Sequence, residues 1–134
     1  MGKIIASVLE DCIFNINFDK KLNKIFKPNE KVLNFLKKYI NEDYNLIVLS
    51  NLCENDYTNL DIVLKQHALD TFKIYYSCEN SKFDIILNTI KPDIYIDTHI
   101  ELCAGLDFYE IDTYLFTENS CIANNKCATG LKIL

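Results

Sequence analysis

The stretch KIIASVLED, residues 3–11, decides which fold the sequence predicts. Its apolar run ends at Leu9, and a short apolar run of this kind is typical of a buried strand. Glu10 and Asp11 follow at once, so the strand would deliver acidic groups to its carboxyl end. Whether those acids form a site, or only end a strand in water, depends on the sheet that the strand joins.

Strand and helix patterns alternate along the chain. We expect strands at residues 3–9, 45–51, 72–77, 93–97 and 111–117, helices from Pro28 and at residues 55–69 and 81–90, and a short helix or turn at residues 99–106. Residues 12–18 alternate between apolar and polar side chains, which is typical of a small hairpin or flap. The alternation of strands and helices predicts right-handed crossovers. We therefore expect a three-layer, Rossmann-like α/β domain, with a mainly parallel five-stranded sheet and helices on both faces.

The length and composition suit one domain. The chain has 134 residues, enough for one hydrophobic core and too few for two. We expect residues 1–117 to form the domain and the tail, residues 118–134, to pack on it. The tail is polar, and its pattern leaves an edge strand, a helix and a partner-binding arm open.

Charge and hydropathy narrow the range of partners. The formal net charge of −5 argues against nucleic acid, and the lysines at positions 20, 21, 24 and 27 are interpreted as a solvated helical surface. No apolar run approaches the roughly 20 residues that span a bilayer, and the start of the chain lacks the features of a signal peptide. We therefore expect a cytoplasmic protein without a membrane partner.

The cysteines do not form a metal-binding pattern. Six are present, at positions 12, 53, 78, 103, 121 and 127, without a C-x-x-C pair and with only two histidines in the chain. This spacing argues against structural zinc, and reduced, buried thiols are the default expectation. Cys121 and Cys127, in the polar tail, are the one pair with spacing that suits a redox or metal role.

Polar side chains follow the first, second and fourth expected strands. In parallel sheets the functional crevice lies at the carboxyl ends of the strands, where the winding reverses. A carboxylate, a hydroxyl, a lysine and a second pair of acids would meet there in that order. Phosphoryl transfer needs this set, because it uses donors for the phosphoryl oxygens, a positive charge, and acids that hold Mg²⁺.

The order and spacing of these groups resemble the haloacid dehalogenase (HAD) superfamily, over nearly the whole chain. In LIVLSN, Ser50 matches the family's phosphoryl donor, and Asn51 stands beside it. In NSKFDII, Lys82 matches the lysine that neutralises the phosphoaspartate. In DIYIDTHIE, Asp97 and Glu101 match the acids that hold Mg²⁺, with Thr98 where a second aspartate often follows the first.

The family's first motif, Asp-x-Asp-x-Thr, is incomplete in this chain. The best register places Val8 at the nucleophile, Glu10 at the acid and base, and Cys12 at the threonine. Valine cannot form an aspartyl phosphate. Registers that begin at Glu10 or Asp11 lose the pair of acids, although both carboxylates remain near the strand end.

The resemblance implies two alternatives for function. The first is a catalytically impaired, phosphatase-like domain without a cap, a pseudoenzyme that binds a phosphorylated ligand or a protein partner. The second is an active Mg²⁺-dependent phosphohydrolase that uses a rearranged carboxylate on an extended or macromolecular phospho-substrate. The implied site comprises catalytic Glu10, Ser50 and Lys82, phosphate-binding Ser50, Asn51 and Lys82, and Mg²⁺ ligands Asp97, Glu101 and Glu10. The alternative is that the same residues have no role in a site and only begin a turn or end strands at the solvated surface.

Overall fold

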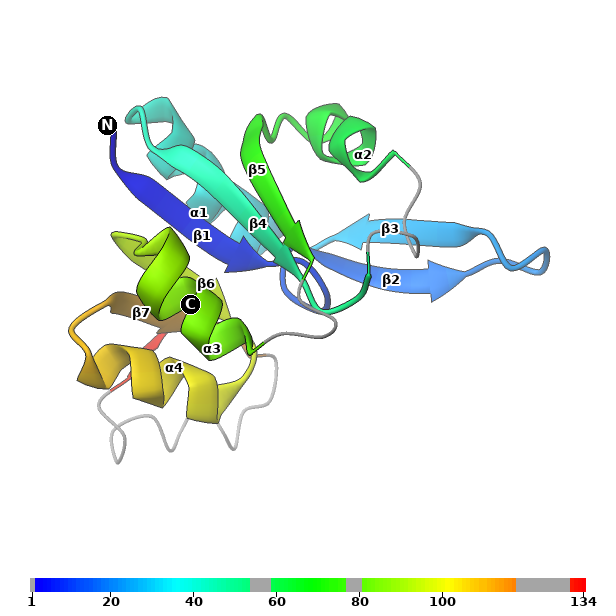
Figure 1. Cartoon of the computed structure of the whole chain (residues 1–134). Coiled ribbons are helices and arrows are strands. Elements are labelled where there is room, and N and C mark those ends of the chain that lie inside the picture. The colour runs from blue at the N-terminus through cyan, green and yellow to red at the C-terminus, as the bar shows by residue number, and fades with distance from the viewer. Residues whose placement is uncertain (1, 54–58, 77–80, 118–130) are drawn as a thin grey trace.

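The computed structural model describes residues 2–53, 59–76, 81–117 and 131–134. The chain alternates between strands and helices (Figure 1). The elements are β1 (Ile4–Val8), β2 (Phe14–Phe18), β3 (Lys24–Pro28), α1 (Glu30–Asn41), β4 (Asn45–Ser50), α2 (Leu60–Gln66), β5 (Thr71–Tyr76), α3 (Lys82–Asp84), the π-helical segment η2 (Ile85–Ile90), β6 (Ile94–Asp97), α4 (Ile100–Phe108), β7 (Asp112–Leu115) and β8 (Lys132–Ile133).

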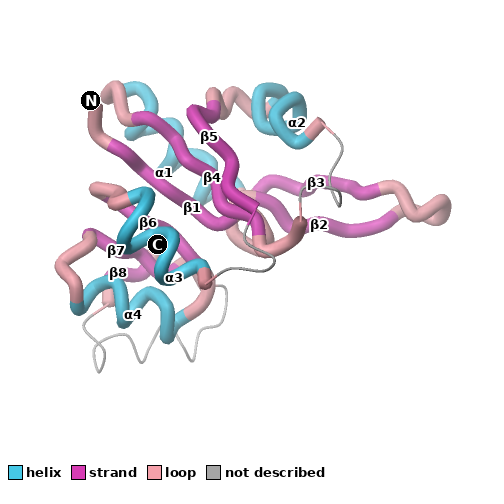
Figure 2. The backbone as a smooth tube through the Cα atoms, in the orientation of Figure 1, coloured by secondary structure: helices cyan, strands magenta, loops and turns pink. Residues whose placement is uncertain are grey.

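Six strands form a parallel sheet in the order β5-β4-β1-β6-β7-β8, with helices beside it (Figure 2). The predicted α/β class with a parallel sheet is therefore confirmed. The predicted number of strands, five, is wrong, because β8 in the tail pairs with β7. This strand has only two residues, which is too short for a hydrophobic pattern to reveal it.

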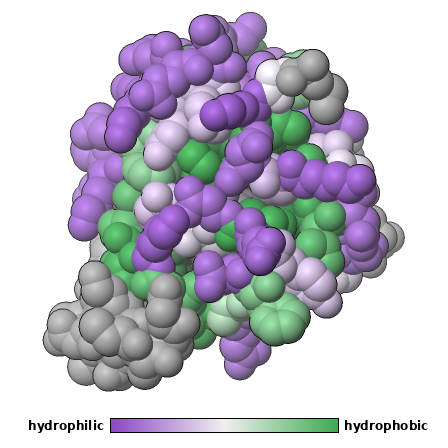
Figure 3. All heavy atoms as spheres, turned by 90° about the vertical axis from the view of Figure 1, so that its left-hand side faces the viewer, coloured by the Kyte–Doolittle hydropathy of each residue, from purple (hydrophilic) through white to green (hydrophobic). Residues whose placement is uncertain are grey.

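Two apolar clusters hold the helices on the sheet. One contains buried residues of α1 and α2, together with Val8, Val48 and Ile96 from the strands. The other contains buried residues of η2 and α4, together with Ala6 and Leu49. Because neighbouring strand residues point to opposite faces, each central strand contributes to both clusters. Figure 3 shows one face of the molecule, on which hydrophilic side chains predominate and hydrophobic ones lie between them.

The strands β2 and β3 form a separate antiparallel hairpin, which confirms the predicted hairpin after β1 (Figures 1 and 2). The lysines at positions 20, 21, 24 and 27 lie in this hairpin, so their interpretation as a helical surface is wrong. Pro28 ends β3, and α1 begins at Glu30 rather than at Pro28. The alternating pattern of residues 12–18 thus continues into a second strand, where the lysine spacing had suggested a helix.

The other boundaries differ from the sequence expectations by a few residues. The described part of the second helix begins at Leu60, and residues 55–58 of the expected helix lie outside the described residues. The third helix starts as α3 and continues as a π-helical segment. Among the described residues, no helix is long and apolar enough to cross a membrane.

Of the three cysteines in the described residues, two fit the expectation of reduced, buried thiols and one does not. Cys12 and Cys103 are free and buried, whereas Cys53 is disulfide-bonded, so the expectation is wrong for Cys53. Cys78, Cys121 and Cys127 lie outside the described residues. Sequence spacing does not determine which cysteines pair, so this bond could not be predicted.

Cys12 and Cys103 are expected to resist alkylation in the native protein. Burial raises the pKa of the Cys12 thiol to about 12, and burial also raises the pKa of Cys103. Since the thiolate is the reactive form, neither thiol should react at pH 8 until the chain unfolds. Peptide mapping after iodoacetamide treatment, with and without urea, checks this. Modification of either residue in the native protein would contradict it.

Candidate functional site

The carboxyl ends of β1 and β4 bring Glu10 to Ser50. The two strands pair in parallel, with Val8 opposite Leu49, so the residues that follow them lie side by side. Ser50 Oγ donates a hydrogen bond of 2.6 Å to Glu10 Oε2. The backbone N–H of Asn51 donates to Glu10 Oε1 at 2.8 Å. The Glu10 carboxylate therefore uses both oxygens to hold the end of β4.

Lys82 lies between Asn51 and Asp97. Its Nζ is 2.9 Å from Asp97 Oδ2 and donates to Asn51 Oδ1 at 3.0 Å. The Asp97 side chain is 1% exposed and that of Lys82 is 16% exposed, so the ion pair is largely shielded from water. The contact of Lys82 with Asp97, on which the predicted site depends, is therefore present.

Further donors surround the Asp97 carboxylate. The N–H groups of Thr98 and His99 donate to Oδ1 at 2.6 Å and 3.1 Å. The hydroxyl of Tyr95 donates to Oδ2. Burial and the charge of Asp97 together raise the pKa of Tyr95 well above its ordinary value, so this phenol stays a donor. Donors from Lys82, Tyr95, Thr98 and His99 thus surround both oxygens of this buried carboxylate.

Sequence reasoning missed Tyr95. In the stretch DIYID, residues two apart lie on the same face of the strand, so Tyr95 and Asp97 share a face. That spacing was the available signal. The spacing alone does not assign Tyr95 to the site, because a tyrosine in a buried strand is more often part of a core than of a polar network.

A pocket of about 610 Å³ opens beside this network. It is lined by Asn51, Ser81, Lys82, Phe83, Asp97, Thr98, His99, Glu101 and Leu102. Glu101 lines it as an exposed residue in the first turn of α4. His99 is the N-cap of α4, and its Nδ1 accepts from the N–H of Leu102 at 3.3 Å. The structure therefore gives His99, to which the sequence assigned no role, a helix-capping role.

Val8 lies away from the pocket. Its side chain is fully buried and belongs to the apolar cluster that also contains residues of α1 and α2. The pocket lining comes from other segments, among them α3 and α4, and does not include Val8. The residue at the predicted nucleophile position is thus part of the core. Asp11 is exposed and has a positive φ of 59°, so it belongs to the turn that follows β1.

The predicted Mg²⁺ ligands do not form a cluster in the described part of the chain. No group of three His, Cys, Asp or Glu residues there could hold a metal ion. Asp97 Oδ2 is paired with the Lys82 ammonium, and both oxygens of Glu10 accept hydrogen bonds from residues that follow β4 or end it. As arranged, the residues do not fit Mg²⁺, and the magnesium site stays a prediction from the resemblance.

The fold and site together define a class: an α/β domain with a parallel sheet and a polar network at the carboxyl ends of β1, β4 and β6. The network joins Glu10, Ser50, Asn51, Lys82 and Asp97 through direct contacts. No protein-family model, curated protein or solved structure matches the chain.

Proposed function

We propose that the chain is a capless HAD-like domain that has lost its nucleophile and serves as a binding module for a phosphorylated ligand or a protein partner. One observation carries this proposal. Val8, at the nucleophile position, is buried in the core, while Ser50, Lys82 and Asp97 remain assembled. The strand order β4-β1-β6, which brings these motifs together, also supports it.

The contacts within the network explain why binding suits this site better than turnover. The Ser50 hydroxyl donates to Glu10, and the Lys82 ammonium contacts Asn51 and Asp97. A phosphoryl group would have to compete with the two carboxylates for these donors. Among the described residues that line the pocket, Lys82 is the one lysine or arginine, so a phosphorylated ligand would bind beside its amine.

The second candidate is an active phosphohydrolase in which Glu10 replaces the missing aspartate. The observation that favours it is the hydrogen bond between Glu10 and Ser50, because this bond holds a half-buried carboxylate beside the predicted phosphoryl donor. The Glu10 carboxylate would attack phosphorus and form an acyl phosphate while the bond to the ester oxygen breaks and the alcohol leaves with a proton from solvent. Water would then hydrolyse the acyl phosphate, which releases inorganic phosphate and restores the carboxylate.

Hydrolysis of p-nitrophenyl phosphate, with and without Mg²⁺, separates the two candidates. The binding module predicts no turnover above background in either condition. Mg²⁺-dependent turnover that is lost in Glu10→Gln and Asp97→Asn, and kept in Asp107→Asn, would contradict it. Asp107 is the matched control because it is an exposed acid of α4 outside the pocket lining.

Binding is tested with inorganic phosphate and thermal unfolding. A ligand that binds only the folded state raises the melting temperature, so phosphate is expected to stabilise the wild-type chain. Asn51→Asp keeps the size of this exposed side chain but adds a negative charge beside Lys82, and should abolish the stabilisation. Equal stabilisation of both proteins would show that phosphate does not bind at this pocket.

A further inference from the structure

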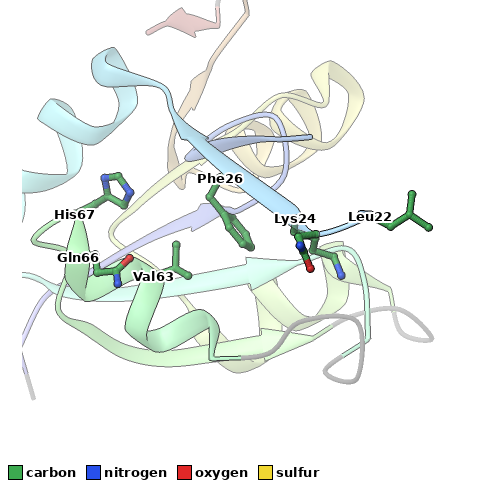
Figure 4. A pocket seen from close by; sticks show the side chains of 7 residues that line it. Leu22, Lys24, Phe26, Val63, Gln66 and His67 are labelled. Atoms are coloured by element: carbon green, nitrogen blue, oxygen red, sulfur yellow. The ribbon is translucent and has the colours of Figure 1, made fainter. Parts of the chain in front are cut away.

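A second groove lies between the hairpin and α2, with a volume of about 570 Å³ (Figure 4). It is lined by Leu22, Asn23, Lys24, Phe26, Val63, Gln66 and His67. In Figure 4, Phe26 from β3 and Val63 from α2 point toward one another across it. None of these residues lines the pocket beside Lys82, so the groove is separate from the site described above.

The hairpin side of the groove combines apolar Leu22 and Phe26 with polar Asn23 and Lys24, and Phe26 is fixed to the core. The Phe14 ring is buried and contacts both Phe26 and His67, with ring centroids 5.6 Å and 5.0 Å away. The hairpin register places Phe18 and Phe26 on the same face as Phe14. Phe18 is 60% exposed and Leu22, on the rim, is 79% exposed. An apolar surface therefore continues from the groove toward the tip of the hairpin.

The same hairpin carries a local positive charge. Residues 14–28 contain four lysines and one aspartate, although the whole chain has a net charge of −5. The aspartate, Asp19, accepts hydrogen bonds from the N–H groups of Lys21 and Asn23 at 2.8 Å and 2.9 Å, which fixes the turn at the tip. These bonds lower the pKa of the Asp19 carboxyl. The lysines therefore lie in and beside a turn of fixed conformation, next to the groove that contains Phe26 and Val63.

We propose that this groove binds an extended, acidic peptide segment of a partner protein. One apolar side chain of the peptide enters between Phe26 and Val63, and its carboxylates face Lys20, Lys21 and Lys24. The amides of Asn23 and Gln66 supply hydrogen bonds for the peptide backbone, as in other sites that bind extended peptides.

The groove favours a peptide over other anions. A lipid surface is flat and would meet the tip of the hairpin without filling the groove. Single-stranded nucleic acid binds through rows of stacked aromatic rings and many basic groups. Here the lining mixes apolar Leu22, Phe26 and Val63 with polar side chains, and its lysine, Lys24, comes from the hairpin side. A peptide with one apolar side chain and adjacent carboxylates matches both the apolar residues of the groove and the positive charge of the hairpin.

Selection from a phage library of random 12-residue peptides on the full chain tests the proposal. The enriched peptides are expected to combine one Leu, Ile, Phe or Met with at least two acidic residues. The consensus peptide is then measured by fluorescence anisotropy. Lys24→Glu should weaken its binding at least about tenfold, because like charges face one another. Lys31→Glu makes the same charge change on α1, outside the groove, and should bind as wild type.

Leu22→Asn separates a binding effect from a folding effect. Leu22 is exposed and has a φ of 63°, a conformation that asparagine adopts more readily than leucine, so the variant should fold. Its binding to the consensus peptide should fall several-fold. No enrichment, a consensus without acidic residues, or equal binding by Lys24→Glu and Lys31→Glu would overturn the proposal. So would binding of a 20-nucleotide oligothymidine or of phosphatidylserine vesicles without binding of any selected peptide.

Discussion

Replacing Lys82 with methionine is expected to lower the free energy of unfolding by about 3 kcal/mol, because it leaves the Asp97 carboxylate buried without its cationic partner. Asp97 is 1% exposed, so its carboxylate has little contact with water in the folded chain. Methionine keeps most of the apolar length of the lysine, so the loss reports charge rather than packing. Urea unfolding monitored by circular dichroism measures the change.

Two further variants make the Lys82 prediction specific. Lys31→Met removes an exposed lysine of α1 and should change stability by less than about 0.5 kcal/mol. Adding Asp97→Asn to Lys82→Met removes the uncompensated charge. The double variant should then lose at least about 1 kcal/mol less than the sum of the two single variants. A cost below about 1 kcal/mol for Lys82→Met would mean that the ion pair is solvated.

Val8→Asp is expected to destabilise the chain by about 4 kcal/mol. Val8 is fully buried and belongs to an apolar cluster, so a carboxylate there would lose its contact with water. A buried carboxyl has a raised pKa in the folded state, so the penalty should shrink as the pH falls and the group is protonated. Urea unfolding at pH 7 and pH 4.5 checks both statements.

The outcome for Val8 also bears on function. Restoring the missing aspartate by this change would ordinarily be tried as a rescue of phosphatase activity, but here it should weaken the fold instead. Val8→Thr keeps the shape of valine and should cost only about 1–2 kcal/mol. If Val8→Asp were as stable as wild type, its carboxylate would have to reach solvent, and the nucleophile register would regain support.

The main features of the fold could be predicted from the sequence because each central strand is a short, continuous apolar run between helical patterns. The hairpin was also predictable, since residues 12–18 alternate. Several features were not, among them the disulfide bond of Cys53 and the second strand of the hairpin, β3. The strand β8 has two residues, and the π-helical geometry of η2 has no hydrophobic period that differs enough from an α-helix to be recognised.

The site could be predicted in part. Ser50 and Asp97 end strands β4 and β6, and Lys82 begins α3. In a parallel sheet of this strand order, these element ends lie at the same edge, so the three positions could be predicted. The sequence could not show that Val8 faces the core, because β1 is apolar on both sides and either face suits a valine. It also could not show that Lys82 would engage Asn51 and Asp97 together, since that depends on side-chain conformation.

The last strand has a consequence for solubility. β8 pairs with the outer edge of β7, and Leu131 beside it is buried against Cys103 and Leu115. Strand edges with unpaired backbone groups are templates for association between chains. Removing residues 131–134 would therefore open one side of the sheet to other molecules and uncover apolar surface at the same place. We therefore expect β8, although it has only two residues, to protect the edge of β7 from aggregation.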